Sequence, residues 1–412
     1  MVPGTMASHD ADADRKARSI DERLAGRMTR LGTETAFEVL AKAQALEAQG
    51  RSVIHLEIGE PDFATPTAIV EAGVQALRNG YTHYTPSPGI MPLRRAIADE
   101  MRRSRGLDVA PEQVVVTPGA KPILFFVMLA LVDEGDEVLC PDPGFPIYES
   151  MIRYAGGTVV PVALPESLGF RLDIDGLRKA ITSRTKMIII NSPANPTGGV
   201  LTPDDLRQIA DLAIRHDLLV FSDEIYSQML YDDTHSSIAV LPGMAERTIV
   251  LDGFSKTYAM TGWRLGYGVF PSALVPHINK LMVNSNSCTA AATQMAGIEA
   301  LTGDQQPVRE MLEEFRRRRD VIVNGLNALP GVTCRMPAGA FYAYPNIQGT
   351  GMRSGDLANM LLNEAGVATL AGTSFGPAGE GYLRLSYANS IANIQEALAR
   401  IGRVLTERKA GS

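Results

Sequence analysis

The sequence has few cysteines and no excess of basic residues. Its 412 residues include three cysteines, Cys140, Cys288 and Cys334, which lie far apart and form no CxxC pair. This spacing predicts a reducing compartment, with neither a disulfide framework nor a structural zinc site. The formal net charge is -7, which argues against nucleic-acid binding through general basicity. We therefore expect no metal and no nucleic-acid partner.

The sequence also lacks a long apolar run. The longest one, ILFFVMLALV at residues 123–132, is too short to cross a bilayer and predicts a buried helix. The first residues, MVPGTMASHDADADRK, lack the apolar core of a signal peptide. Their composition predicts a disordered tail over residues 1–30. We expect a cytoplasmic protein with no membrane partner.

Strand-like and helix-like segments alternate from about residue 64 onward. The strand candidates are short and apolar throughout, which is typical of parallel strands covered on both faces. They lie at residues 113–118, 136–141, 186–193, 218–224, 248–254 and 266–270. A helix is predicted at residues 202–217, where a threonine N-cap precedes acidic residues. The pattern favours an α/β fold with a mostly parallel sheet.

The character of the sequence changes near residue 309. A long charged helix begins there, followed by the strand-like segments FYAYPN and YLRLSYA and a closing helix. The helix predicted at residues 35–49 has no sheet of its own, so we expect it to pack with this C-terminal part. The length also exceeds that of one typical hydrophobic core. We predict a large domain at residues 64–308 and a smaller α+β domain built from residues 31–63 and 309–412.

Polar residues gather where the predicted strands end, which is where ligands bind in open α/β sheets. Asp223 ends one strand, and Asn195 lies in the loop after another. Ala120 and Lys121 follow a glycine directly before a helix. Free amides at a helix N-terminus favour an anion. Each motif taken alone is more often a plain turn or a helix cap.

The segment GFSKTYAMTGWRLG places Lys256 and Arg264 in a nearly uncharged stretch. A surface loop with two solvated cations would explain it simply. With the strand-end residues, however, the two cations match the needs of pyridoxal phosphate. Its aldehyde requires a lysine amine, its ring nitrogen a carboxylate such as Asp223, and its phosphate fixed donors such as a guanidinium.

The ordered motifs resemble those of class I aminotransferases, which are fold-type I pyridoxal-phosphate enzymes, and most closely the bacterial aspartate aminotransferase group. The resemblance runs from about residue 33 to the last helix. It is carried by LEIGEPDFATP, YTHYTPSPGIMPLRRAIA, PANPTGG, SDEIY, GFSKTYAMTGWRLG, GAFY and YLRLSYA. It implies an enzyme of amino-acid metabolism that moves an amino group from an L-amino acid to a 2-oxo acid, such as 2-oxoglutarate or pyruvate, by a ping-pong mechanism.

The resemblance also implies how the cofactor is held. Lys256 would form the Schiff base and move the proton, and Asp223 would pair with the ring nitrogen. Tyr226 and Asn195 would hydrogen-bond the ring hydroxyl oxygen, and Phe145 would stack on the ring. The residues implied at the phosphate are Ser255, Arg264, the amides of Ala120 and Lys121, and Tyr84 of a neighbouring subunit.

For the substrate, the resemblance implies that Arg384 binds the α-carboxylate, helped by the Gly59 amide and Asn195. It implies a homodimer with shared active sites. Phe145 stands where the aspartate enzymes commonly have tryptophan, so strict specificity for aspartate does not follow. Ala120 has no hydroxyl, so phosphate binding would depend more on backbone amides. The arginines at residues 316–319 are expected to form a solvated face.

Other functions stay open at this point. A β-eliminating C–S lyase or a ring-forming synthase would use the same lysine and aspartate. A lyase releases pyruvate and ammonia from one substrate, whereas a transaminase requires an oxo-acid acceptor. A transcription regulator with this fold would need a DNA-binding module, and the acidic N-terminal tail is too short to supply one.

Overall fold

The computed structural model describes residues 19–232 and 234–410. Residues 1–18 of the predicted disordered tail therefore lie outside the described residues. The part of the tail that is described forms two short 3-10 helices, Asp21–Arg23 and Gly26–Arg30. No helix in the described ranges is long and apolar enough to cross a membrane.

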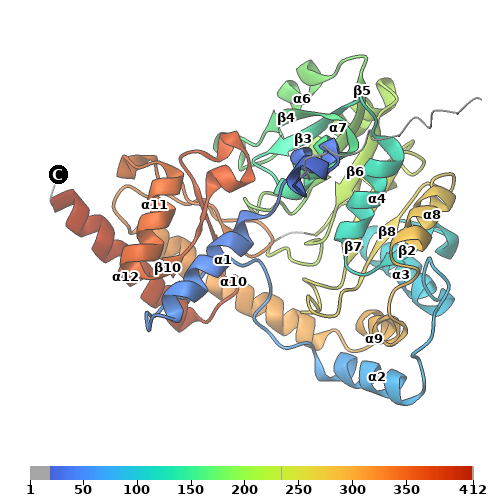
Figure 1. Cartoon of the computed structure of the whole chain (residues 1–412), viewed down its shortest axis with the longest axis horizontal. Helices are drawn as coiled ribbons and strands as arrows, with labels where there is room; N and C mark the ends of the chain where they lie inside the picture. The colour runs from blue at the N-terminus through green and yellow to red at the C-terminus, as the bar shows by residue number, and fades with distance from the viewer. Residues whose placement is uncertain (1–18, 233, 411–412) are drawn as a thin grey trace, which may run out of the picture.

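A large sheet occupies the right-hand half of the molecule (Figure 1). Within the described residues it has seven strands in the order β2-β8-β7-β6-β5-β3-β4. Strand β8 is antiparallel to both of its neighbours, β2 and β7, and the pairings among the other strands are all parallel. The predicted α/β fold with a mostly parallel sheet is therefore confirmed. The bounds are β2 Val114–Thr117, β3 Glu137–Asp142, β4 Thr158–Ala163, β5 Thr185–Asn191, β6 Leu219–Asp223, β7 Thr248–Gly253 and β8 Gly266–Val269.

Helices cover both faces of this sheet, which explains the continuous apolar strands. On one face, Val115 and Phe221 pack with residues of α4, α5 and α8. On the other face, Val116 and Val250 pack with α3 and α9, and Val220 packs with α6 and α7. The bounds are α2 Thr67–Arg78, α3 Met91–Arg105, α4 Lys121–Leu131, α5 Pro146–Ala155, α6 Ile174–Ala180, α7 Pro203–Arg215, α8 Val275–Ser285 and α9 Ala291–Thr302.

The N-terminus of α7 shows how a local sequence pattern determines where a helix begins. Thr202 Oγ1 accepts a hydrogen bond from the Asp205 amide at 3.1 Å, and the Asp205 carboxylate accepts one from the Thr202 amide at 2.8 Å. Pro203 follows at the first helical position, where its missing N–H costs nothing. The helix predicted from this threonine is confirmed.

Both chain ends build the other half of the molecule. Strand β1 pairs in parallel with β10, and β11, β12 and β9 form an antiparallel sheet. Ala43 of α1 packs against Leu362 and Ala368, so α1 (blue) lies beside C-terminal elements (red) in Figure 1, as predicted. The bounds are α1 Thr35–Glu47, β1 Ile54–His55, α10 Gln306–Asn327, β9 Tyr342–Ala343, α11 Ser354–Met360, β10 Val367–Ala368, β11 Leu370–Ala371, β12 Leu383–Ser386 and α12 Ile391–Ala410.

The arginines at residues 316–319 of α10 do not form one solvated face, so that expectation is wrong for two of the four. Arg318 and Arg319 are each only 6% exposed. Arg318 donates to Asp62 at 2.6 Å, and Arg319 donates to Asp232 at 2.9 Å. Both partners come from segments far away in the sequence, and these segments cover one side of the helix.

Candidate active site

A cavity of about 600 Å3 lies at the carboxyl ends of the sheet strands. It is lined from both halves of the molecule. Eleven of the twelve predicted site residues line it: Gly59, Ala120, Lys121, Phe145, Asn195, Asp223, Tyr226, Ser255, Lys256, Arg264 and Arg384. Tyr84 is the exception, because its side chain lies elsewhere and is 89% exposed.

Lys256 reaches the cavity from the turn that follows β7. Its Nζ donates to the backbone oxygen of Gly59 at 2.5 Å and lies 6.0 Å from the ring centre of Tyr226 and 5.9 Å from that of Phe341. Burial of the amine lowers the pKa of Lys256 to about 8. An appreciable fraction of the amine is therefore neutral near physiological pH, and the neutral form is the one that acts as nucleophile and base.

Asp223 ends β6 and is held by two hydrogen bonds. One oxygen accepts from the Tyr148 hydroxyl at 2.5 Å, and the other accepts from the Ile225 amide at 3.2 Å. Burial raises the pKa of Asp223 to about 6, although both hydrogen bonds oppose the rise. The group is therefore mostly anionic at neutral pH and suits a cationic partner in the cavity.

The start of α4 and Arg264 form a place for an anion. Ala120 is the N-cap of α4 and Lys121 its first residue, so their amides have no partner within the helix. Arg264 has φ 54°, a left-handed conformation that is uncommon for non-glycine residues. Gly119 has φ 83°, a left-handed conformation that favours glycine. A Cβ added there would meet the Arg264 guanidinium, so glycine leaves room for the guanidinium beside the helix terminus.

Arg384 of β12 also lines the cavity. Its Nη1 donates to Asn195 Oδ1 at 3.2 Å, and its Nη2 donates to the Glu57 backbone oxygen. Its Nε is buried with no hydrogen-bond partner among the described residues. The guanidinium lies 4.5 Å from the ring centre of Tyr342. A buried cation with an unused donor provides a binding site for a carboxylate.

Several lining residues were not anticipated from the sequence. Tyr148 follows the predicted Phe145 by one helical turn, so this spacing was the available signal. Tyr342 lies in GAFY and hydrogen-bonds the Tyr226 hydroxyl at 2.7 Å. Glu34 and Phe37 also line the cavity, and the Glu34 carboxylate pairs with Lys121. No local sequence pattern indicated that Glu34 and Phe37 would line the cavity.

The polar groups of the cavity fit pyridoxal phosphate. Lys256 offers an amine, Asp223 a buried carboxylate, and the α4 terminus with Arg264 an anion site beside Gly119. Among the described residues, no group of three or more His, Cys, Asp and Glu could hold a metal ion. The fold and site define a fold-type I pyridoxal-phosphate enzyme.

Comparison with known proteins gives the family. Residues 51–401 match the family described as "Aminotransferase class I and II", and the chain belongs to it. The chain is 44% identical to an aspartate aminotransferase of Pyrococcus abyssi over 363 residues, 87% of this chain and 93% of the relative. It is 42% identical to aromatic-amino-acid aminotransferase 2 of Thermococcus litoralis over 367 residues, 88% of this chain and 94% of the relative.

A solved structure shows the same architecture. The aspartate aminotransferase from Thermus thermophilus with maleate superposes with a TM-score of 0.89 at 40% identity, covering 92% of this chain and 99% of that one. The family depends on pyridoxal phosphate and transfers amino groups. The present chain is therefore a pyridoxal-phosphate-dependent transaminase.

Proposed function

We propose that the enzyme transfers an amino group from an L-amino acid to a 2-oxo acid, such as 2-oxoglutarate or pyruvate, as a cytoplasmic homodimer with a ping-pong mechanism. The observation that supports this most is that Lys256, Asp223 and Arg384 meet at one cavity from three separate elements. When bound, pyridoxal phosphate supplies an electron sink that stabilises negative charge at the substrate α-carbon. We further propose the domain division at residues 31–63, 64–308 and 309–412.

The proposed chemistry needs one mobile proton and one fixed charge. Lys256 Nζ takes the proton from the substrate α-carbon, for which an amine with a pKa of about 8 is suited. Asp223 would accept a hydrogen bond from the ring nitrogen of the cofactor, and Tyr148 holds the carboxylate in place. Tyr226 and Asn195 would hydrogen-bond the ring hydroxyl oxygen. The side chains of these five residues all line the same cavity.

The remaining roles concern binding. Arg384 holds the substrate α-carboxylate as a fork, together with the Gly59 amide and the Asn195 side chain. Phe145 would stack on the cofactor ring. Ser255, Arg264 and the amides of Ala120 and Lys121 would hold the phosphate, joined by Tyr84 from the second subunit.

The substrate side chain has a mixed surface to contact. Phe37 and Leu124 offer apolar atoms, while Lys121 and Glu34 form an ion pair at the cavity. The relatives above are named for aspartate and for aromatic amino acids. We propose an acidic or aromatic amino donor. Each of these relatives is named as an aminotransferase, so the lyase alternative gains no support.

Chemical labelling of the lysine tests this function. Borohydride reduction followed by peptide mapping is expected to find the pyridoxyl group on Lys256, because its buried amine lines the cavity and is partly neutral near physiological pH. Lys256→Ala is expected to retain cofactor but lose most turnover, whereas Lys186→Ala, at a partly exposed lysine paired with Asp136, is expected to behave as the unaltered enzyme. A pyridoxyl label on Lys121 would contradict the assignment.

The reaction type is tested separately. With an amino donor alone, a transaminase completes only a half-reaction, and continued turnover requires a 2-oxo acid. Continued release of pyruvate and ammonia without an acceptor would instead establish β-elimination.

A further inference from the structure

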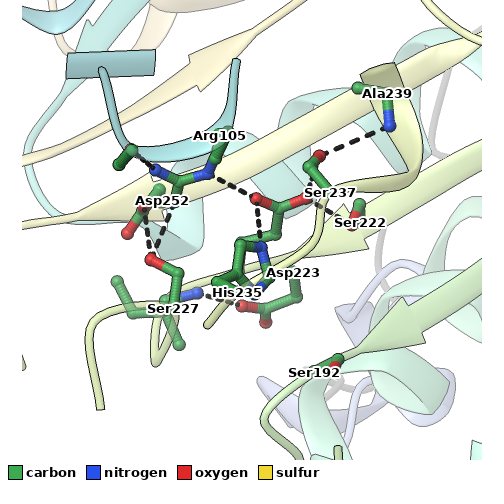
Figure 2. Close-up of polar contacts among 12 residues, drawn as sticks. Arg105, Ser192, Ser222, Asp223, Ser227, His235, Ser237, Ala239 and Asp252 are labelled. Atoms are coloured by element: carbon green, nitrogen blue, oxygen red, sulfur yellow. Dashed lines mark hydrogen bonds and ion pairs between the residues drawn. The ribbon is translucent and has the colours of Figure 1, made fainter. Parts of the chain in front are cut away.

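A buried polar cluster lies behind the cavity, on the far side of the strands that carry Asp223 and lead to Lys256. Side chains alternate along a strand, so Ser222 and Asp252 point away from the face that Asp223 occupies. Figure 2 shows the cluster around Arg105, with Asp252, Ser227, His235 and Ser237. The function proposed above assigns no role to any of these residues.

Arg105 is the centre of the cluster. It is the last residue of α3, and its side chain is 1% exposed. Its Nε donates to Glu224 Oε2 at 2.7 Å. Its Nη2 donates to Ser227 Oγ at 2.8 Å and also pairs with the Asp252 carboxylate. One guanidinium therefore links the residue after β6 to a residue within β7.

These links bear directly on the cofactor site. Glu224 is the chain neighbour of Asp223, and Asp252 precedes Lys256 by four residues. The Glu224 amide also donates to the Leu251 backbone oxygen at 2.9 Å. The guanidinium thus fixes the ends of two neighbouring strands, from which the ring-binding carboxylate and the lysine turn both emerge.

The cluster also sets the charge behind Asp223. Two buried carboxylates, Glu224 and Asp252, lie close enough to raise the pKa of Asp223 further, in addition to the larger effect of burial. Glu224 stays ionised although burial opposes this, because His235, with Nε2 2.9 Å away, and Arg105 hold its pKa well below the usual range. Removing a buried counter-ion leaves its partner's charge uncompensated.

We propose that Arg105 is a positioning residue of the cofactor site, which keeps Asp223 ionised by neutralising the two carboxylates behind it. This inference rests on the proposed pairing of Asp223 with the cofactor ring nitrogen. Besides Arg105, the titratable groups around Asp223 are Tyr148 and Tyr226 beside it and Glu224 and Asp252 behind the strand. Lys256 lines the same cavity, and His235 pairs with Glu224.

The test measures the dissociation constant of pyridoxal phosphate as a function of pH, by equilibrium dialysis of the full-length protein. Protonation of Asp223 removes the anion opposite the ring nitrogen, so binding weakens as pH falls through its pKa. In Arg105→Gln, Asp252 loses its paired cation and Glu224 keeps only His235, so the added negative charge raises the proton affinity of Asp223. The midpoint of this weakening is expected to move upward, by about 1–3 pH units.

Three further proteins separate charge from other effects. The double variant Arg105→Gln/Glu224→Gln removes one charge of each sign, so its midpoint is expected to return toward that of the unaltered protein. Arg319→Gln removes another buried arginine, far from Asp223 in the sequence, and is expected to leave the midpoint unchanged. Repeating the titrations in a Lys256→Ala background removes any contribution from protonation of the lysine.

Each outcome decides between the alternatives. An unchanged midpoint in Arg105→Gln, or a double variant that stays as shifted as the single one, would overturn the proposal. If Arg105→Gln does not fold, Glu224→Gln alone is expected to lower the midpoint, and no change there would overturn it equally. If the pH dependence persists in Asp223→Asn, the proposed role of Asp223 itself is wrong.

Discussion

Arg384 is a buried cation whose hydrogen-bond partners, within the described residues, are all neutral groups. It donates to a backbone oxygen and to an amide oxygen, and its Nε has no partner. Burial lowers the pKa of the guanidinium, since a charge in a low-dielectric site is costly. A bound carboxylate would supply both the opposite charge and the missing acceptor.

Arg384→Lys is therefore expected to weaken the binding of all amino-acid and 2-oxo-acid substrates alike. A lysine cannot reproduce the planar fork, and losing one hydrogen bond to a charged group costs about 1.5–3 kcal/mol, or roughly 10- to 100-fold in kcat/KM. Cofactor affinity is expected to stay unchanged. A loss confined to dicarboxylic substrates would show that Arg384 binds a side-chain carboxylate instead.

Most strands of the sheet could be predicted because the sequence of each strand favours a buried strand without reference to the rest of the chain. All six predicted strands form, and each is apolar because helices cover both faces. Strand β4 was missed: it lies at the edge of the sheet, its residues are half exposed, and it contains Pro161. Proline is tolerated at an edge, but it weakens the strand signal.

The site was predictable to the extent that its residues follow strand ends or lie in motifs. Glu34 reaches the cavity from the start of α1, whose position depends on tertiary packing. The burial of Arg318 and Arg319 has the same origin, since Asp62 and Asp232 cover the helix from distant segments. Such contacts have no local sequence signature.

At the element scale, the cap of α7 gives a stability prediction. Thr202→Ala removes the side-chain acceptor for the Asp205 amide and is expected to lower the free energy of unfolding by about 1 kcal/mol, measured by urea denaturation. The matched control is Thr302→Ala at the end of α9, where the hydroxyl only donates back to Ile298. Equal and negligible effects of both substitutions would show that the capping box does not stabilise the fold.

At the scale of the whole molecule, the exposed aromatic Tyr84 suggests an incomplete site. Its side chain is 89% exposed, although it lies in a motif that matches the family. Leu77 and Tyr81 nearby are exposed as well. A second copy of the chain would cover such a surface, and the phenol would then reach the phosphate of the neighbouring cofactor.

The shared site is tested by mixing two inactive proteins, Lys256→Ala and a disruptive Tyr84 variant, after dissociation and reassembly. In a hybrid dimer, one site receives the intact lysine and the intact tyrosine together, so activity is expected to return in part. Tyr84→Phe alone is expected to weaken cofactor binding by about 1.5–3 kcal/mol. If hybrids form but activity never returns, Tyr84 serves its own chain.

The pairing of β1 with β10 brings an early segment of the chain against a late one. This pairing affects the order in which the two binding sites form during synthesis. All the cofactor-contacting residues proposed within one chain, up to Arg264, leave the ribosome long before Arg384 and the strand that carries it. Strand β1 emerges early but has no partner until residues 367–368 are made. Since domains generally fold as units during translation, the cofactor site can assemble first. The substrate site is complete only when translation is nearly finished.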